Sequence, residues 1–178
     1  MRVGELLGLT WDCVDFKNGV IHVQKQITVS RGKGHPPHFA PLKNGKTRII
    51  NPAPYVMEVL KRHRARETEK MWNAGDLWNP GEFPNLVFTR EDGSHLIQTR
   101  IWKEFQDALE KAGLGHFRAH DCRHTFAVNS IRMGDNIKTI QENMGHYSAA
   151  FTLDTYGHVT DTMRQESAER MEAFIQSL

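Results

Sequence analysis

Apolar and polar residues alternate near the start of the chain, on both sides of Asn18-Gly19. Residues 14–17 come before this dipeptide and residues 20–23 follow it. Asn-Gly between two alternating apolar segments is the strongest short-range signal for a β-hairpin, because both residues tolerate the positive φ angles of its turn. The pattern predicts a hairpin whose second strand continues toward Val29.

A second Asn-Gly pair, Asn44-Gly45, separates residues 39–43 from residues 47–51. Residues 30–39, which come before it, are rich in Gly, Pro and His and are expected to form a loop. With the first hairpin, this pattern predicts a small antiparallel sheet of three strands.

Most of the remaining chain has the spacing of helices. Pro52 and Pro54 are suited to a helix start, and Gly134 and Gly145 are suited to helix ends. A Gly- and Pro-rich loop is expected over residues 73–85 and a short strand over Leu86–Thr89. The predicted fold is α+β and mostly helical. Helices are expected over residues 2–9, 52–72, 98–112, 120–133, 137–144, 149–156 and 162–177.

Composition limits the class of protein. The chain has 178 residues, of which 39% are hydrophobic and 25% are charged, as in an ordinary globular domain. No apolar segment is long enough for a transmembrane helix, and the first residues lack the core of a signal peptide. Cys13 and Cys122 lie far apart, which argues against a disulfide framework and fits a reducing cytoplasm.

Positive charge is concentrated in residues 25–48. The net charge of the chain is only +2, but this segment contains no Asp or Glu. It could contact the phosphates of nucleic acid, or it could be a solvated basic loop. Its basic residues are Lys25, Arg31, Lys33, Lys43, Lys46 and Arg48.

The C-terminal half contains residue types that could cleave a phosphodiester without a metal. Such cleavage needs a nucleophile, cations on the non-bridging oxygens and an acid for the departing oxygen. Arginine suits the second task, because its planar fork binds two phosphate oxygens and stays charged. His120 and Arg123 come first along the chain, followed by Gly145-His146 and then by Tyr156.

This order resembles the C-terminal signature of the tyrosine recombinase, or phage integrase, family. In that signature a His-x-x-Arg motif precedes a Gly-His motif, and the nucleophilic tyrosine follows ten residues after the second His. The sequence from Thr152 to Val159 is similar to the family's usual sequence around this tyrosine. Tyr147, directly after His146, is the nearest competing tyrosine and is interpreted as a packing or DNA-contact residue.

The N-terminal half also resembles the family. Residues 2–11 are similar to its first arginine motif, which implies a catalytic Arg2 and a supporting Glu5. The family places a catalytic lysine in a β-hairpin turn. Lys43, just before Asn44-Gly45, matches that place best, and Lys46 is the alternative.

The resemblance implies a DNA breaking-rejoining fold and a mechanism that needs no cofactor and no ATP. Tyr156 would form a 3′-phosphotyrosine bond, with the phosphate clamped by Arg2 and Arg123. Lys43 would protonate the leaving 5′ oxygen. The two histidines would assist: His120 would accept the tyrosine proton or position the phosphate, and His146 would hydrogen-bond the phosphate.

The implied partner is double-stranded DNA, contacted also by the basic residues of the 25–48 segment, and no membrane is involved. Residues 1–160 would form the catalytic domain, preceded in family members by a DNA-binding domain that is absent from this sequence. Residues 161–178 would form a helical tail that packs either on its own domain or on a neighbouring protomer in a tetrameric synapse. The expected role is integration or excision of a mobile element.

Two other readings remain open from the sequence. The chain could be a fragment that binds DNA or protein without cutting it. It could also be a metal-dependent hydrolase, because His116, His120 and His124 are spaced four apart. Against a metal site, Arg123 lies inside the cluster, and Gly113 and Gly115 make a continuous helix through His116 doubtful.

Overall fold

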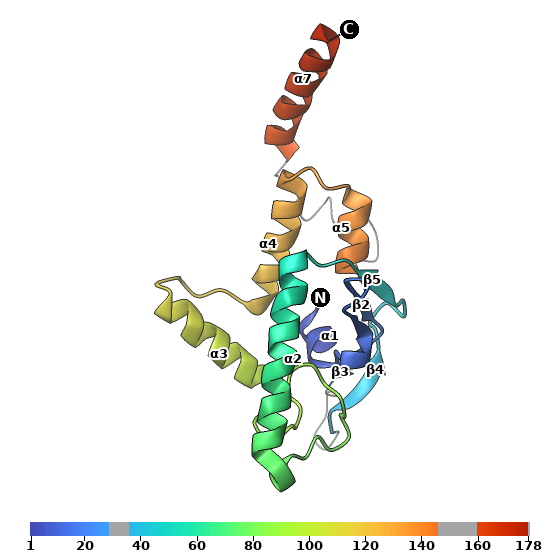
Figure 1. Ribbon diagram of the computed structural model, residues 1–178. Coiled ribbons are helices and arrows are strands. Elements are labelled where there is room, and N and C mark those ends of the chain that lie inside the picture. Colours follow the sequence, from blue (N-terminus) through green and yellow to red (C-terminus); the bar gives the residue numbers. More distant parts are fainter. Residues whose placement is uncertain (29–35, 146–159, 178) are drawn as a thin grey trace. The chain divides into compact units, whose positions relative to one another are not determined.

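The structure is a computed structural model that describes residues 1–28, 36–145 and 160–177. The chain divides into two compact units, Met1–His120 and Asp121–Leu178 (Figure 1). This division does not coincide with the predicted functional boundary at residue 160, which stays a prediction.

Short antiparallel strands form two sheets in the first unit. A three-stranded sheet has the order β1-β2-β5, and a two-stranded sheet joins β3 to β4. The three-stranded antiparallel sheet was predicted and is confirmed. The strands are β1 (Val14–Asp15), β2 (Val20–Val23), β3 (Lys25–Thr28), β4 (His38–Pro41) and β5 (Arg48–Ile50).

The pairing differs from two simple hairpins. The first Asn-Gly turn does join β1 to β2, with Val14 opposite Ile21. The second turn also forms, since the amide of Gly45 donates to the carbonyl of Leu42 at 2.8 Å. However, β4 pairs with β3, whereas β5 pairs with β2. The consecutive strands β2 and β3 thus belong to different sheets, so the two strands that flank the second turn, β4 and β5, do not pair with each other.

The helices of the first unit lie close to their predicted positions. They are α1 (Val3–Leu7), α2 (Pro54–Ala74) and α3 (Gln98–Lys111), with 3-10 turns at Trp11–Cys13 and Gly75–Leu77. The strand expected over Leu86–Thr89 is not formed; only isolated bridges join Thr10 to Leu86 and Thr89 to His95. The apolar residues of this segment pack into the core without forming a strand, and Val87 is fully buried.

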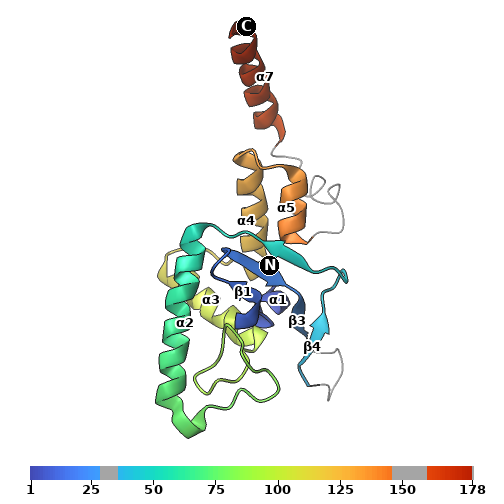
Figure 2. The same cartoon turned by 45° about the vertical axis from the view of Figure 1, so that its right-hand side comes forward.

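The main core of this unit lies between α2 and the three-stranded sheet. Met57 and Leu60 of α2 belong to the same buried cluster as Ile21 and Val23 of β2. In Figure 2, the first part of α2 runs beside the strands. A second cluster joins α1 to β3 through Leu7 and Ile27 and to the loop before α3.

The second unit is built from helices. It contains most of α4 (Ala119–Arg132), together with α5 (Ile137–Met144) and α7 (Thr160–Gln176). Helices α4 and α5 pack through a cluster formed by Ala127, Ile131, Ile140 and Met144. The predicted stop at Gly145 is confirmed, because this glycine ends α5 with a φ of 63°.

The helix expected over residues 149–156 lies outside the described residues. None of the described helices is both long and apolar enough to span a bilayer.

Candidate active site

Arg2 and Glu5 meet at the beginning of α1. Glu5 occupies the third position of the helix, and its carboxylate reaches back to the backbone amide of Arg2, 2.8 Å from Oε2. This is half of a capping box, which satisfies an amide that the helix itself leaves unpaired. The guanidinium of Arg2 also donates to Glu5 Oε1 at 3.0 Å. The structure thus brings together the predicted catalytic arginine and its predicted supporting carboxylate.

A second arginine holds the same carboxylate. Arg48, at the start of β5, donates from Nη1 to Glu5 Oε1 at 3.1 Å and from Nη2 to Glu5 Oε2 at 2.6 Å. This parallel, two-bond arrangement is the strongest geometry for an arginine–carboxylate pair. Arg48 was predicted as a DNA contact, yet its side chain is 9% exposed and its fork faces Glu5. Its position therefore favours a role inside the protein.

Glu5 is ionised in this environment. Burial raises the pKa of this carboxyl, because only 1% of the residue is exposed. Hydrogen bonds from Arg48 and from Arg2 oppose burial and prevail, so that the pKa falls to about 2. The carboxylate is therefore negative at any working pH and holds both guanidiniums.

The two candidate lysines lie on the turn that leads from β4 to β5. Lys43 and Lys46 are both exposed, and the backbone amide of Lys46 donates to the Asn44 side chain at 3.2 Å. Exposure suits either lysine to reach a DNA strand. The choice between Lys43 and Lys46 stays open.

The other predicted DNA contacts fall into two groups. Lys25 lies on β3 with its Nζ 4.4 Å from the centre of the Phe39 ring, a cation–π contact. Arg31 and Lys33 lie outside the described residues, so their predicted role stays a prediction.

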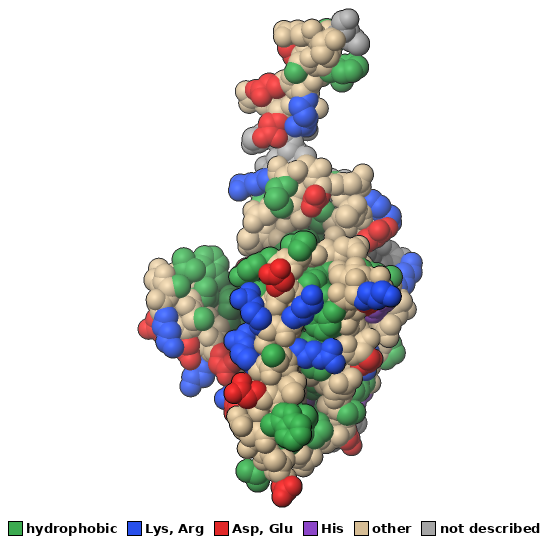
Figure 3. All heavy atoms as spheres, viewed as in Figure 1, with side chains coloured by type: hydrophobic (Ala, Val, Ile, Leu, Met, Phe, Trp, Pro, Cys, Tyr) green, Lys and Arg blue, Asp and Glu red, His purple; other side chains and the backbone are tan. Residues whose placement is uncertain are grey.

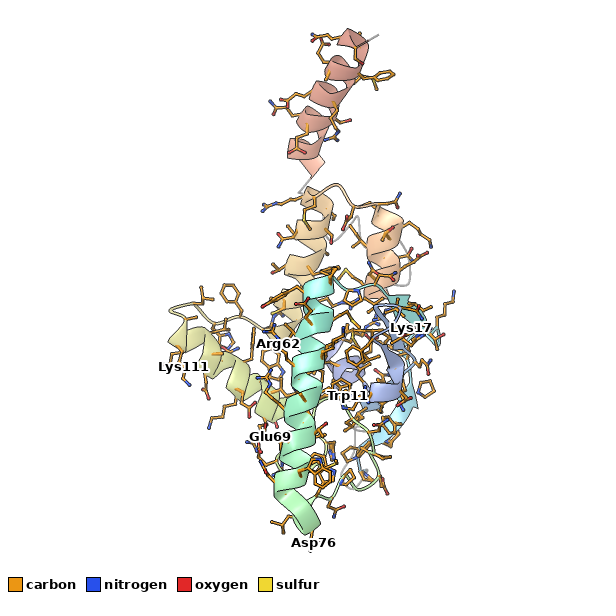
Figure 4. The ribbon with its side chains drawn as sticks, viewed as in Figure 1. Trp11, Lys17, Arg62, Glu69, Asp76 and Lys111 are labelled. Atoms are coloured by element: carbon orange, nitrogen blue, oxygen red, sulfur yellow. The ribbon has the colours of Figure 1, made fainter. Side chains whose placement is uncertain are left out.

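Sequence reasoning passed over a row of basic residues on α2. Figure 3 shows blue side chains gathered along this helix. Arg64 of this helix stacks over Trp11, with its Cζ 5.5 Å from the ring centre. Figure 4 labels Arg62 on α2 and Trp11 next to the helix. The signal in the sequence is a run of cations without an acid, which is usual for a solvated helix face. The exposed basic residues are Lys61, Arg62, Arg64 and Arg66.

The His-x-x-Arg motif lies at the start of α4. His120 is exposed, whereas Arg123 is buried, with 8% of the residue exposed. Nη2 of Arg123 donates to the backbone carbonyl of Met144, the last residue of α5. This bond ties the second predicted clamp arginine to the chain immediately before Gly145-His146.

His146 and Tyr156 lie outside the described residues, as does Tyr147. Arg2 belongs to the first compact unit and Arg123 to the second.

The described residues give no support to a metal site. His116 precedes α4 and does not share its helical face with His120 and His124. No group of three or more potential metal ligands gathers within the described part of the chain.

The chain belongs to the phage integrase family, which it matches over residues 1–163. It is 29% identical over 178 residues to a tyrosine recombinase XerC-like protein of Caldanaerobacter subterraneus subsp. tengcongensis, across 96% of this chain and 46% of that protein. It is 28% identical over 180 residues to the integrase of Staphylococcus phage L54a, across 98% of this chain and 49% of that protein. The chain thus spans about half the length of these curated relatives.

Solved structures of the same kind share the fold. The Tn1549 transposon integrase, in complex with transposon right end DNA, aligns with a TM-score of 0.75 and 26% identity over 97% of this chain and 55% of that chain. XerA recombinase aligns with a TM-score of 0.67 and 25% identity over 96% of this chain and 53% of that chain. The fold implied by the resemblance is confirmed.

Proposed function

We propose that this chain is the catalytic part of a tyrosine-type site-specific DNA recombinase that serves integration or excision of a mobile element. Its substrate is double-stranded DNA, and it needs neither a metal nor a high-energy cofactor. Family membership supports the reaction class, and the DNA bound to the Tn1549 integrase supports the substrate class.

The reaction proceeds by exchange of phosphodiester bonds. Tyr156 Oη attacks the scissile phosphorus, forming a phosphotyrosine bond to the 3′ side as the bond to the 5′ oxygen breaks. His120 accepts the tyrosine proton, and Lys43 donates a proton to the departing 5′ oxygen. Attack by another 5′-hydroxyl reverses the step and joins a new strand. One phosphate ester replaces another, so no external energy source is required.

One observation carries this proposal, namely the Arg2–Glu5 pair at the start of α1. Arg2 is 27% exposed in its side chain, whereas its anchor Glu5 is 1% exposed and ionised. A cation fixed before the substrate arrives can stabilise charge on a non-bridging oxygen without reorganising. Arg123 and His146 complete the phosphate site in the proposed reaction.

Assembly on DNA is proposed to involve the tail. Met171, Phe174 and Ile175 follow helical spacing on α7 and are more than half exposed. Apolar side chains on one helical face are suited to packing against another protein surface. A neighbouring protomer in a tetrameric synapse is the proposed partner.

The proposed compartment is the reducing cytoplasm, where DNA is accessible. Neither Cys13, which is buried, nor Cys122, which is exposed, forms a disulfide.

A covalent-adduct assay tests the reaction. The protein is incubated in EDTA with a supercoiled plasmid that carries the DNA flanking its own coding sequence. Denaturing gel electrophoresis then detects protein bound covalently to DNA. We expect an adduct with the native chain, or with the longer gene product if the gene encodes one, and none with Tyr156→Phe, because the ring without its hydroxyl cannot attack phosphorus.

Tyr147→Phe is the matched control and should retain the adduct. Cleavage that disappears in EDTA would favour a metal-dependent hydrolase instead. DNA binding without any adduct, in the chain and in the longest gene product alike, would leave a non-cleaving DNA-binding protein as the better description.

A further inference from the structure

Two guanidiniums share one buried carboxylate at the start of α1. Arg48 forms two bonds to Glu5 through both of its terminal nitrogens, whereas Arg2 forms one side-chain bond and one backbone bond. Arg48 comes from β5, which is 43 residues away from Glu5 in the sequence. The contact therefore joins two elements that only the fold brings together.

Arg48 is the stronger of the two partners. Its side chain is 9% exposed and that of Arg2 is 27% exposed, so the pair with Arg48 is better shielded from water. Among the groups that lower the pKa of Glu5, the hydrogen bonds from Arg48 have the largest effect. Arg48 and Arg2 together keep Glu5 charged.

We infer that Arg48 is a positioning residue for the phosphate-binding Arg2, acting through Glu5; this inference rests on the proposed function. By engaging both carboxylate oxygens, Arg48 prevents Glu5 from drawing the whole fork of Arg2 into a two-bond pair of its own. Arg2 is held at the helix start by its side-chain bond to Glu5 Oε1 and its backbone bond to Glu5 Oε2, and its side chain is the more exposed of the two. Arg48 itself does not touch the DNA.

Arg48 also lies close to the turn that carries the two candidate lysines. The turn with Lys43 and Lys46 ends two residues before Arg48. Anchoring Arg48 on Glu5 therefore fixes the C-terminal end of this turn relative to α1. The buried carboxylate thus binds the first clamp arginine directly and, through Arg48, anchors the strand that follows the turn with the candidate proton donor.

Arg48→Lys and Arg48→Met test the inference. Lysine keeps the charge but loses the planar fork, and methionine loses both. We expect both variants to bind plasmid DNA with unchanged affinity and salt dependence, but to form the covalent adduct roughly tenfold to a hundredfold more slowly at saturating DNA, because a slightly displaced clamp costs rate rather than binding. Arg62→Lys, at an exposed position on α2, is the matched control and should keep the native rate.

The pH dependence of the rate of adduct formation distinguishes a positioning role of Arg48 from a merely structural one. In the native protein Glu5 remains ionised between about pH 8 and pH 5. In Arg48→Met the pKa of Glu5 should rise, since burial is then opposed mainly by Arg2. The rate deficit of Arg48→Met should therefore grow on acidification, and in a Glu5→Gln background the same substitution should add little.

Carbon-13 NMR titration of Glu5 without DNA separates this inference from the proposed function. A raised pKa in Arg48→Met supports the link whether or not the native protein forms an adduct, and an unchanged pKa overturns it. Native adduct formation with an unchanged rate in both Arg48 variants also overturns it. Weaker binding with a smaller salt slope and a normal rate at saturation would make Arg48 a phosphate contact instead.

Discussion

Glu5 is a buried acid whose charge depends on its neighbours. Burial disfavours a carboxylate, because the charged form loses its hydration. Two arginine side chains and one backbone amide replace the lost water through four contacts of 2.6 to 3.1 Å. Glu5 thus forms a structural ion pair with Arg48 and anchors the predicted catalytic Arg2.

Acid stability should reveal Glu5 at the residue scale. Its pKa falls from 4.5 to about 2 on folding, so it stabilises the folded state above about pH 4.5, and this stabilisation is lost as the pH falls toward 2. We expect Glu5→Gln to lower the free energy of unfolding by roughly 3 kcal/mol at neutral pH. The difference from the native protein should shrink steadily below about pH 4.5.

Urea unfolding at a series of pH values measures this effect. Glu58→Gln, at an exposed position on α2, is the control and should follow the native curve. A constant difference between Glu5→Gln and the native protein at every pH would contradict the assignment of the lowered pKa to Glu5.

At the scale of elements, α1 depends on its close approach to β3. A Cβ atom added at Gly8 would lie 2.7 Å from the backbone nitrogen of Ile27, and one added at Gly4 would lie 2.9 Å from the carbonyl oxygen of the same residue. Only glycine allows the two backbones to come this close. This contact sets the position of α1 and hence of Arg2 and Glu5.

Gly8→Ala should therefore be destabilising. The clash is with the backbone of β3, which cannot turn aside as a side chain can, so we expect a loss of about 1–3 kcal/mol in the free energy of unfolding. Gly115→Ala is the control, because nothing lies within 4 Å of a Cβ at that position. Chemical denaturation compares the two variants, and equal stabilities would show that α1 can shift away from β3 without cost.

At the scale of the whole molecule, helix α7 has exposed apolar side chains. The curated relatives are about twice as long as the chain. Met171 and Phe174 are each 58% exposed and Ile175 is 56% exposed. Contiguous apolar side chains of this kind on a surface are typical of contact sites with other proteins.

Replacing Met171, Phe174 and Ile175 with Gln should separate assembly from folding. Because these side chains are exposed, we expect an unchanged thermal unfolding midpoint. The higher-order protein–DNA complexes should be lost, as measured by analytical ultracentrifugation with plasmid-derived duplex DNA. Alanine at Gln165, Glu169 and Glu172 changes the opposite face of α7 and should leave assembly intact; equal assembly by both triple variants would remove the tail from the synapse.

Most helices could be predicted from the sequence because their signals are local. The helix from Ile137 to Met144 was predicted with the observed bounds, since Gly145 marks its end. The order of Arg2, His120, Arg123, His146 and Tyr156 likewise identified the family, because it is a property of the chain itself. The family match over residues 1–163 agrees with that identification.

Tertiary structure alone decided which strands pair and what Arg48 contacts. Alternation with a period of two indicates a strand but does not name its partner, so the sequence could not tell that β5 joins β2 rather than β4. The sequence shows that Arg48 is a cation. It does not show that the Arg48 guanidinium binds the carboxylate of Glu5, 43 residues earlier in the chain. Pairing partners are chosen by burial and by distance in space, and neither quantity is written in the local pattern of residues.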